Sequence, residues 1–236
     1  MPNWTTNKVV CSKEIALKVL GKENDEDIFD FNKLIPMPKE LDLTSGSLEY
    51  RAICYYYNSL NKSDKLKLRN MLKNKEVFFY GNYLNKYKDR LKATKKDLEE
   101  YNTKFMSNKD NFDNTTKFNS LYELGKRYIQ NIEEYNYANW FDWCNVNWGT
   151  KWNSCDNQVF IDEETGDYNF VFETAWSVPY EIVKEYSKLC KDEEFLWIYW
   201  DEGYEEMNIL TKANGKIVLT VEASDLECDD CETEYD

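Results

Sequence analysis

Trp140-Phe141-Asp142-Trp143-Cys144-Asn145-Val146-Asn147-Trp148-Gly149-Thr150-Lys151-Trp152-Asn153 holds four of the eight tryptophans in this 236-residue chain. Apolar side chains recur at steps of four, three and four at Tyr137, Phe141, Cys144 and Trp148. This spacing places them on one helix face and predicts one helix from Leu121 to Trp148. Gly149 suits the left-handed residue after a helix, and a strand is expected to begin at Trp152. We therefore expect a helix–turn–strand junction at the centre of the fold, packed under a sheet.

The segments on either side of this junction predict an α+β fold. Short apolar runs, either alternating or continuous, are bounded by turn signals and therefore predict strands. These predicted strands lie both before and after the predicted helices. Asn214-Gly215 is the signature of a two-residue hairpin turn. The predicted strands are 8–11, 152–161, 168–174, 195–200, 207–210 and 216–221, with helices over 13–20 and 179–190. Between the first helix and the middle of the chain we expect an acidic loop over 23–27 and an extended segment over 29–38. This order predicts a ferredoxin-like (split βαβ) antiparallel sheet, with helices on one face and a C-terminal β-hairpin.

The middle of the chain has a different composition. Residues 61–104 carry 13 Lys and Arg against 6 Asp and Glu, whereas the last fifteen residues carry 8 acidic residues and none that is basic. We predict a ferredoxin-like core over 1–44 and 120–222, a helical, Lys-rich insertion over 45–119, and an acidic tail over 223–236.

Composition excludes several classes of function. The chain contains no histidine, so histidine-based catalytic triads and metal sites are excluded. Its formal charge of −14 argues against a general nucleic-acid coat protein. No apolar run is long enough for a transmembrane helix, and the polar N-terminus lacks a signal sequence. Seven irregularly spaced cysteines then indicate reduced thiols, so we expect a protein of the cytoplasm of a bacterial host, with no membrane partner.

Five segments together resemble the YubB ferredoxin-like domain family of phages and plasmids. They are Pro2 to Asn7, Phe31 to Pro38, Trp143 to Trp152, Phe172 to Pro179 and Asp201-Glu202-Gly203; Trp-Gly-Thr-Lys-Trp and Thr-Ala-Trp-Ser-x-Pro are the most specific elements. The resemblance covers roughly residues 1–44 and 120–205. It implies a ferredoxin-like fold and an origin in a phage or other mobile element, and it carries over no catalytic residues.

Four carboxylates near the tryptophans form the first candidate site: Asp142, Glu173, Asp201 and Glu202. One interpretation is a site for a divalent metal or for acid–base chemistry, in which case Asp201, Glu202 and Asp142 are the catalytic residues. The other interpretation is pairing with lysines and backbone N–H groups, which we favour because no spacing here matches a metal-binding loop. No cofactor and no metal ligand are expected.

Trp176 and Lys151 form the second candidate site. Trp176 lies between a strand and a helix, where it serves either as an exposed stacking platform or, as we favour, as a cap on the core. Lys151 makes a cation–π contact or holds an anion, or, as we favour, it pairs with Asp142 or Glu173. The expected binding residues are Trp176, Lys151, Glu173, Asp201 and Glu202, and the expected structural residues are Trp4, Trp143, Trp148, Gly149 and Trp152.

The remaining features leave three hypotheses for function. Cys228 and Cys231 form a lone CxxC in an acidic tail, which we interpret as having no metal or redox role. Cys54 and Cys144 stand among apolar residues and are expected to be buried. The preferred hypothesis is a non-enzymatic interaction protein of a phage or mobile element that antagonises a host defence system by binding a host or phage protein through its acidic surface. The alternatives are a metal-dependent hydrolase or nuclease using the carboxylates, and nucleic-acid binding through the basic residues of 61–104.

Overall fold

The computed structural model describes residues 3–77, 80–108, 117–191, 194–203 and 206–223. The chain divides into two compact units: one comprises residues 1–36 and 147–236, which we call the sheet unit, and the other comprises residues 37–146, which we call the helical unit. No described helix is long and apolar enough to cross a membrane.

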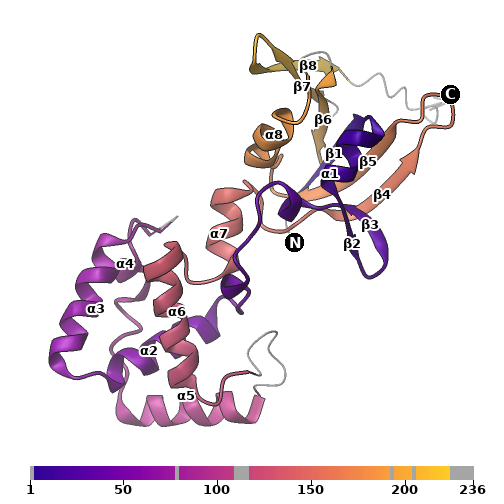
Figure 1. The fold of residues 1–236 in the computed structure, drawn as a ribbon. Coiled ribbons are helices and arrows are strands. Elements are labelled where there is room, and N and C mark those ends of the chain that lie inside the picture. The colour runs from indigo at the N-terminus through magenta and orange to yellow at the C-terminus, as the bar shows by residue number, and fades with distance from the viewer. Residues whose placement is uncertain (1–2, 78–79, 109–116, 192–193, 204–205, 224–236) are drawn as a thin grey trace, which may run out of the picture. The chain divides into compact units, whose positions relative to one another are not determined.

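The described part of the sheet unit contains a six-stranded antiparallel sheet in the order β4-β5-β1-β6-β7-β8 (Figure 1). The α+β class is thus confirmed. The strands are β1 (Trp4–Cys11), β4 (Cys155–Ile161), β5 (Tyr168–Ala175), β6 (Leu196–Asp201), β7 (Glu206–Ala213) and β8 (Lys216–Ala223). The predicted C-terminal hairpin is therefore part of this sheet, and Asn214 and Gly215 adopt the positive φ angles that its turn requires.

Two helices, α1 (Lys13–Val19) and α8 (Tyr180–Ser187), lie on one face of this sheet (Figure 1). A small hairpin of β2 (Leu20–Glu23) and β3 (Glu26–Phe29) follows α1, where the sequence indicated an acidic loop. Phe29 at the end of β3 is fully buried, and its ring contacts the rings of Phe172, Tyr186 and Trp197. The core of the sheet unit is therefore rich in aromatic residues.

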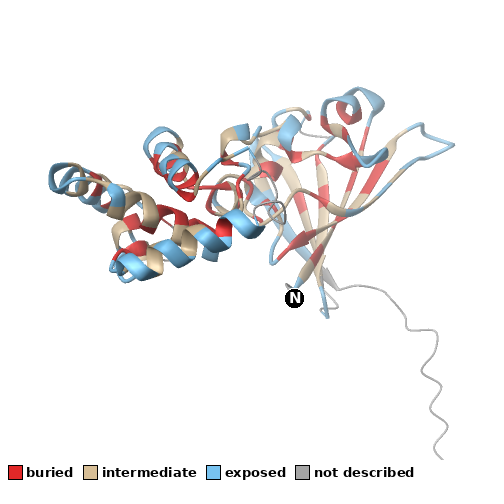
Figure 2. Ribbon diagram, turned by 90° about the horizontal axis from the view of Figure 1, so that it is seen from below, coloured by how far each residue is buried: buried red, intermediate tan, exposed pale blue. Residues whose placement is uncertain are grey.

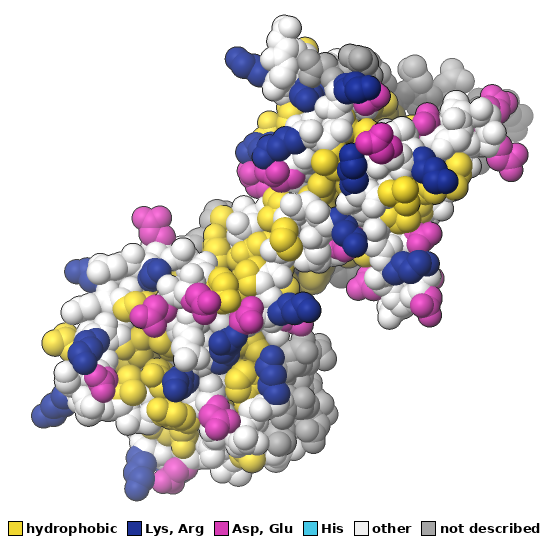
Figure 3. Space-filling view, in the orientation of Figure 1, with side chains coloured by type: hydrophobic (Ala, Val, Ile, Leu, Met, Phe, Trp, Pro, Cys, Tyr) yellow, Lys and Arg dark blue, Asp and Glu magenta, His cyan; other side chains and the backbone are white. Residues whose placement is uncertain are grey.

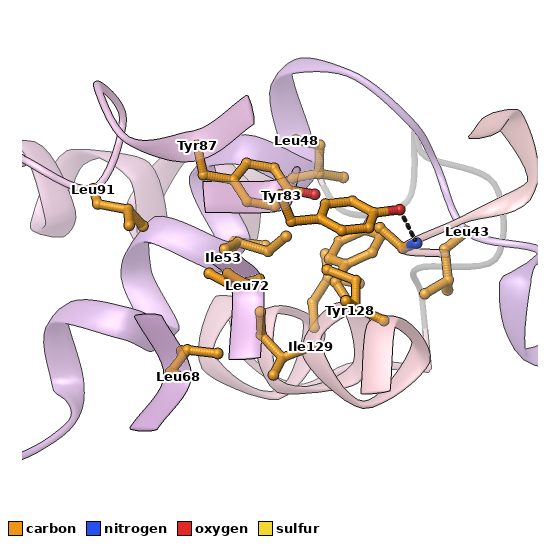
Figure 4. Close-up of a cluster of buried hydrophobic side chains, with 14 of the residues drawn as sticks. Leu43, Leu48, Ile53, Leu68, Leu72, Tyr83, Tyr87, Leu91, Tyr128 and Ile129 are labelled. Carbon is orange, nitrogen blue, oxygen red and sulfur yellow. Dashed lines mark hydrogen bonds between the residues drawn. The ribbon is translucent and has the colours of Figure 1, made fainter. Parts of the chain in front are cut away.

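The helical unit contains α2 (Ser47–Ser59), α3 (Lys62–Asn74), α4 (Tyr83–Tyr87), α5 (Lys95–Asn108), α6 (Leu121–Tyr135) and α7 (Trp140–Asn147), whose last residue lies beyond the unit boundary. A 3-10 turn, η1 (Phe31–Lys33), lies on the segment of 29–38 that was expected to be extended, and a second, η2 (Lys39–Leu41), follows it. The helices of this unit carry both buried and exposed residues (Figure 2), and the buried ones are mostly hydrophobic. They form a core of leucines, isoleucines and tyrosines, in which the Tyr83 hydroxyl accepts a hydrogen bond from the Ala138 N–H at 3.2 Å (Figure 4).

One prediction about this unit was wrong. The single helix over 121–148 is broken, because Asn136 adopts the left-handed conformation (φ +65°) and ends α6. Within the helical unit α6 packs on α2, where Gly125 lies so close that an added Cβ would come within 2.0 Å of the Ala52 carbonyl oxygen. The helical unit spans residues 37–146, whereas the predicted insertion spans 45–119.

Candidate functional site

Three tryptophans and one lysine gather at one edge of the sheet unit. The site consists of Trp4, Lys151, Trp152 and Trp176, which we call the tryptophan edge. Trp4 begins β1 and pairs with Ala175 at the end of β5, so the two strands bring Trp4 and Trp176 to the same end of the sheet. The rings of Trp4 and Trp152 stack with their centroids 6.1 Å apart and an interplanar angle of 29°.

The loop of residues 149–154 positions Lys151 and Trp152. The hydroxyl of Thr150, which is 1% exposed, donates to the Ala175 carbonyl at 2.9 Å, and the Ser154 hydroxyl donates to the Phe29 carbonyl at 2.8 Å. Gly149 begins this loop with φ +79°, as predicted, and its carbonyl accepts from the Ser177 hydroxyl at 2.9 Å. Because hydrogen bonds hold the loop on both sides of Lys151, the loop is a fixed part of the site.

Lys151 contacts two of these aromatic rings. Its ammonium nitrogen lies 3.8 Å from the ring centroid of Trp152 and 5.4 Å from that of Trp176. A cation over the face of a tryptophan is attracted by the negative ring face, and this attraction is stronger for tryptophan than for other aromatic residues. Lys151 therefore makes the cation–π contact that was one of its predicted roles, although the partners are Trp152 and Trp176.

Trp176 combines exposure with an unfavourable backbone conformation. Its side chain is 49% exposed, and its φ angle is +75°, in the left-handed region that favours glycine. Its backbone N–H donates to the Asn3 carbonyl at 2.8 Å, which holds it against the start of β1. Residues kept in such conformations occur preferentially at functional sites.

Carboxylates flank the tryptophan edge. Glu173 lies on β5, three residues before Trp176. Asp156 on β4 and Glu202 after β6 lie close enough to influence Glu173 electrostatically. Partial burial and then the negative charges of Asp156 and Glu202 raise the pKa of Glu173. The sequence predicted Glu173 and Glu202 but not Asp156, which comes close through an irregularity in the β4–β5 pairing between Cys155 and Gln158.

Asp201 and Glu202 are partly occupied by hydrogen bonds to β1. Asp201 accepts a 2.5 Å hydrogen bond from the Thr5 hydroxyl. Glu202 accepts from the Trp4 backbone N–H at 3.3 Å, and its own N–H donates to the Trp4 carbonyl at 2.8 Å. Both residues thus tie the end of β6 to the start of β1, which is the element-end pairing that we favoured from the sequence.

Asp142 belongs to the helical unit and is engaged there. It is 5% exposed, and its Oδ2 accepts from the Lys86 ammonium group at 2.7 Å and from the Tyr83 hydroxyl at 3.4 Å. Glu49 pairs with the same ammonium group at 3.0 Å. The proposed catalytic set of Asp201, Glu202 and Asp142 is therefore divided between two units, and its third member is neutralised by Lys86, a partner that the sequence did not reveal.

No three histidine, cysteine, aspartate or glutamate side chains in the described part of the chain are arranged to hold a metal ion. Cys54 and Cys144 are buried as predicted, and burial raises the pKa of Cys144 to about 12. Of the expected structural residues, Trp143 and Trp148 are buried. Cys228 and Cys231 lie outside the described residues, as does most of the acidic tail.

Many cations of the basic segment already have partners. Lysines 67, 95 and 104 pair with acidic residues on their own helices, and Lys86 is buried between Glu49 and Asp142. Positive and negative side chains are interspersed on the face of each unit that Figure 3 shows. This mixing gives no support to a continuous basic surface of the kind that follows a nucleic-acid backbone.

Glu173→Gln tests the electrostatics of the site. Removing the charge relieves the repulsion from Asp156 and Glu202, so we expect the free energy of unfolding at pH 7 to rise by about 0.5 kcal/mol. The pKa of Glu173 is raised in the folded protein, so the folded state takes up this proton more readily than the unfolded state. The difference between variant and wild type should therefore shrink as the pH falls through this pKa.

Urea denaturation of both proteins between pH 7 and pH 4 measures this effect. Glu163→Gln, in the exposed β4–β5 turn, is the matched control and should leave the stability unchanged. A Glu173→Gln protein that is less stable than wild type at pH 7 would contradict the repulsion.

Comparison of the chain with family models, curated proteins and solved structures gives no match.

Proposed function

We propose that this protein is a non-enzymatic interaction protein and that the tryptophan edge is its contact surface. The observation that carries the proposal is Trp176, a large aromatic side chain that is half exposed at a backbone position suited to glycine. Tryptophan is enriched among the residues that dominate the energy of protein interfaces. A residue that is both strained and exposed is better explained by a contact outside the chain than by packing within it.

The charges around the edge indicate the chemistry of the partner. Glu173 is held near Asp156 and Glu202, and partial burial together with repulsion from these two carboxylates raises its pKa. A partner that brings an arginine or lysine to these carboxylates relieves the repulsion, while the tryptophan rings cover its apolar surface. We therefore propose a protein partner with a cationic side chain beside an apolar patch.

The resemblance to the YubB family extends this proposal. It supports a ferredoxin-like domain in the sheet unit, and the order β4-β5-β1-β6, with α1 after β1 and α8 after β5, fits that topology. It also supports a phage or mobile-element origin and a host or phage protein as the partner. We propose antagonism of a host defence system by direct binding as the biological role.

A capture experiment with the full chain tests the contact surface. Wild type, Trp176→Gly and Phe160→Ser would each be immobilised and exposed to lysate of bacterial cells with and without phage infection. Phe160 is the matched control because it is also exposed, at 51%, but lies toward the far end of β4. We expect a protein retained by wild type and Phe160→Ser and reduced at least tenfold with Trp176→Gly, as for an interface hot spot. Equal retention by all three would overturn the proposed surface.

A further inference from the structure

The helical unit contains a cavity of about 220 Å³ that is separate from its buried ion pairs. It is lined by Ser47, Tyr50, Arg51, Cys54, Arg90 and Tyr101. Helix α2 supplies four of these residues, the segment after α4 supplies Arg90, and α5 supplies Tyr101. The chain has only four arginines, and two of them line this one cavity.

Both guanidinium groups lie within cation–π distance of a tyrosine ring. The central carbon of the Arg51 guanidinium lies 5.7 Å from the ring centroid of Tyr101, and that of Arg90 lies 5.7 Å from the ring centroid of Tyr50. A contact with the face of a ring leaves the N–H groups at the rim of the guanidinium available for hydrogen bonds to a ligand.

Neither arginine makes a side-chain hydrogen bond or an ion pair with any residue that the structure describes. None of the six lining residues is acidic. Asp97 lies near enough to contribute to the raised pKa of Cys54, but its carboxylate accepts from the Thr94 backbone N–H at 2.8 Å and from the Thr94 hydroxyl at 2.7 Å. In a chain with a formal charge of −14, two guanidinium groups without carboxylate partners point to an external anion.

We propose that this cavity binds the phosphoryl group of a small phosphate monoester. Two guanidinium groups supply a charge of +2, which matches the dianionic monoester better than a carboxylate or a nucleic-acid diester, each of which carries one negative charge. Arginine binds phosphate oxygens through two parallel N–H groups, a geometry that lysine cannot offer. The Ser47 hydroxyl and the tyrosines are further polar groups in the lining.

Thermal denaturation and calorimetric titration of the full chain test this site with three defined ligands. The probes are adenosine 5′-monophosphate, glucose 6-phosphate and inorganic sulfate, with adenosine and glucose as uncharged controls. Both monoesters are expected to raise the melting temperature, and the uncharged controls are not. Similar affinities for the two monoesters would show that the phosphoryl group alone is recognised, whereas tighter binding of the nucleotide would identify nucleotides as the source.

The variants separate binding from folding. Arg90 is exposed, so Arg90→Gln should fold normally and bind the monoesters at least tenfold more weakly, because a charge-assisted hydrogen-bonding pair is lost. Arg69→Gln, which removes an exposed arginine of α3 that does not line the cavity, should bind like wild type. Equal binding by Arg90→Gln and wild type would overturn the proposal. Sulfate, which is also a tetrahedral dianion, should bind through Arg90 as well. A single-stranded oligonucleotide binding through Arg90 while the monoesters do not would also overturn the proposal.

Discussion

Lys86→Met is expected to destabilise the helical unit by about 3–5 kcal/mol. The Lys86 side chain is 6% exposed and pairs with two buried carboxylates, those of Glu49 at 3.0 Å and Asp142 at 2.7 Å. Methionine has a similar volume but no charge, so the variant would leave two negative charges facing each other without compensation. Removing one partner of a buried ionic group costs far more than the group's net contribution to stability.

Guanidinium or urea denaturation measures this loss directly. Lys67→Met is the matched control, because Lys67 is exposed and pairs with Asp64 only at the surface. Exposed pairs of this kind contribute about 0–1 kcal/mol, so the control should unfold almost like wild type. A Lys86→Met protein that loses no more stability than Lys67→Met would show that the buried charges are not coupled.

Lys86 should also make the free energy of unfolding depend on pH in the alkaline range. Burial alone would lower the pKa of Lys86, but Glu49 and Asp142 outweigh burial and raise this pKa above its ordinary value of 10.5. A group with a raised folded-state pKa stabilises the fold below its unfolded pKa, and this stabilisation is lost as the pH rises through the folded value. Wild type should therefore lose stability above about pH 10.5, and Lys86→Met should lack this part of the loss.

Phe29→Ala is expected to destabilise the sheet unit by about 3–5 kcal/mol. Phe29 is fully buried and contacts five rings, those of Phe31, Phe170, Phe172, Tyr186 and Trp197. Truncation removes the shared neighbour of residues from η1, β5, β6 and α8, and the fixed sheet prevents the site from collapsing fully. Phe160→Ala removes a ring that is 51% exposed and should cost much less. Equal losses in the two variants, measured by denaturation, would contradict the role of Phe29 at the centre of the core.

The parts of the fold that local patterns control could be predicted from the sequence. Gly149 and Asn214-Gly215 have the positive φ angles that their turns require, and the predicted strand over 8–11 is part of β1, which begins earlier, at Trp4, and also buries Thr5 and Asn7. The break after α6 could not be predicted from the apolar pattern, which continues through it. Asn136 ends that helix with help from a tertiary contact, because its side-chain oxygen accepts from the Lys75 ammonium group at 2.6 Å. Asn24 and Asp25 form the β2–β3 turn, but their acidic surroundings indicated a loop.

The candidate site could be predicted only in part, because some of its contacts depend on tertiary structure. The order of short segments along the chain brings Trp176, Lys151 and Glu202 to one end of the sheet. Asp142 is close to Lys151 in sequence, yet the boundary between the two units falls between them, after Val146. The partners of Asp142 and the cavity shared by Arg51 and Arg90 depend on contacts between helices, for which the sequence carries no local signal.

The free energy of unfolding of Trp176→Gly tests most directly whether Trp176 is kept for contact with a partner. Glycine adopts the left-handed conformation of this position without the cost of roughly 1–2 kcal/mol that other residues bear. The ring that the substitution removes is already 49% exposed. We predict that Trp176→Gly unfolds within about 1 kcal/mol of wild type. A loss of about 3 kcal/mol or more, as expected for removal of a buried tryptophan, would show that Trp176 serves the core and would contradict the proposed contact surface.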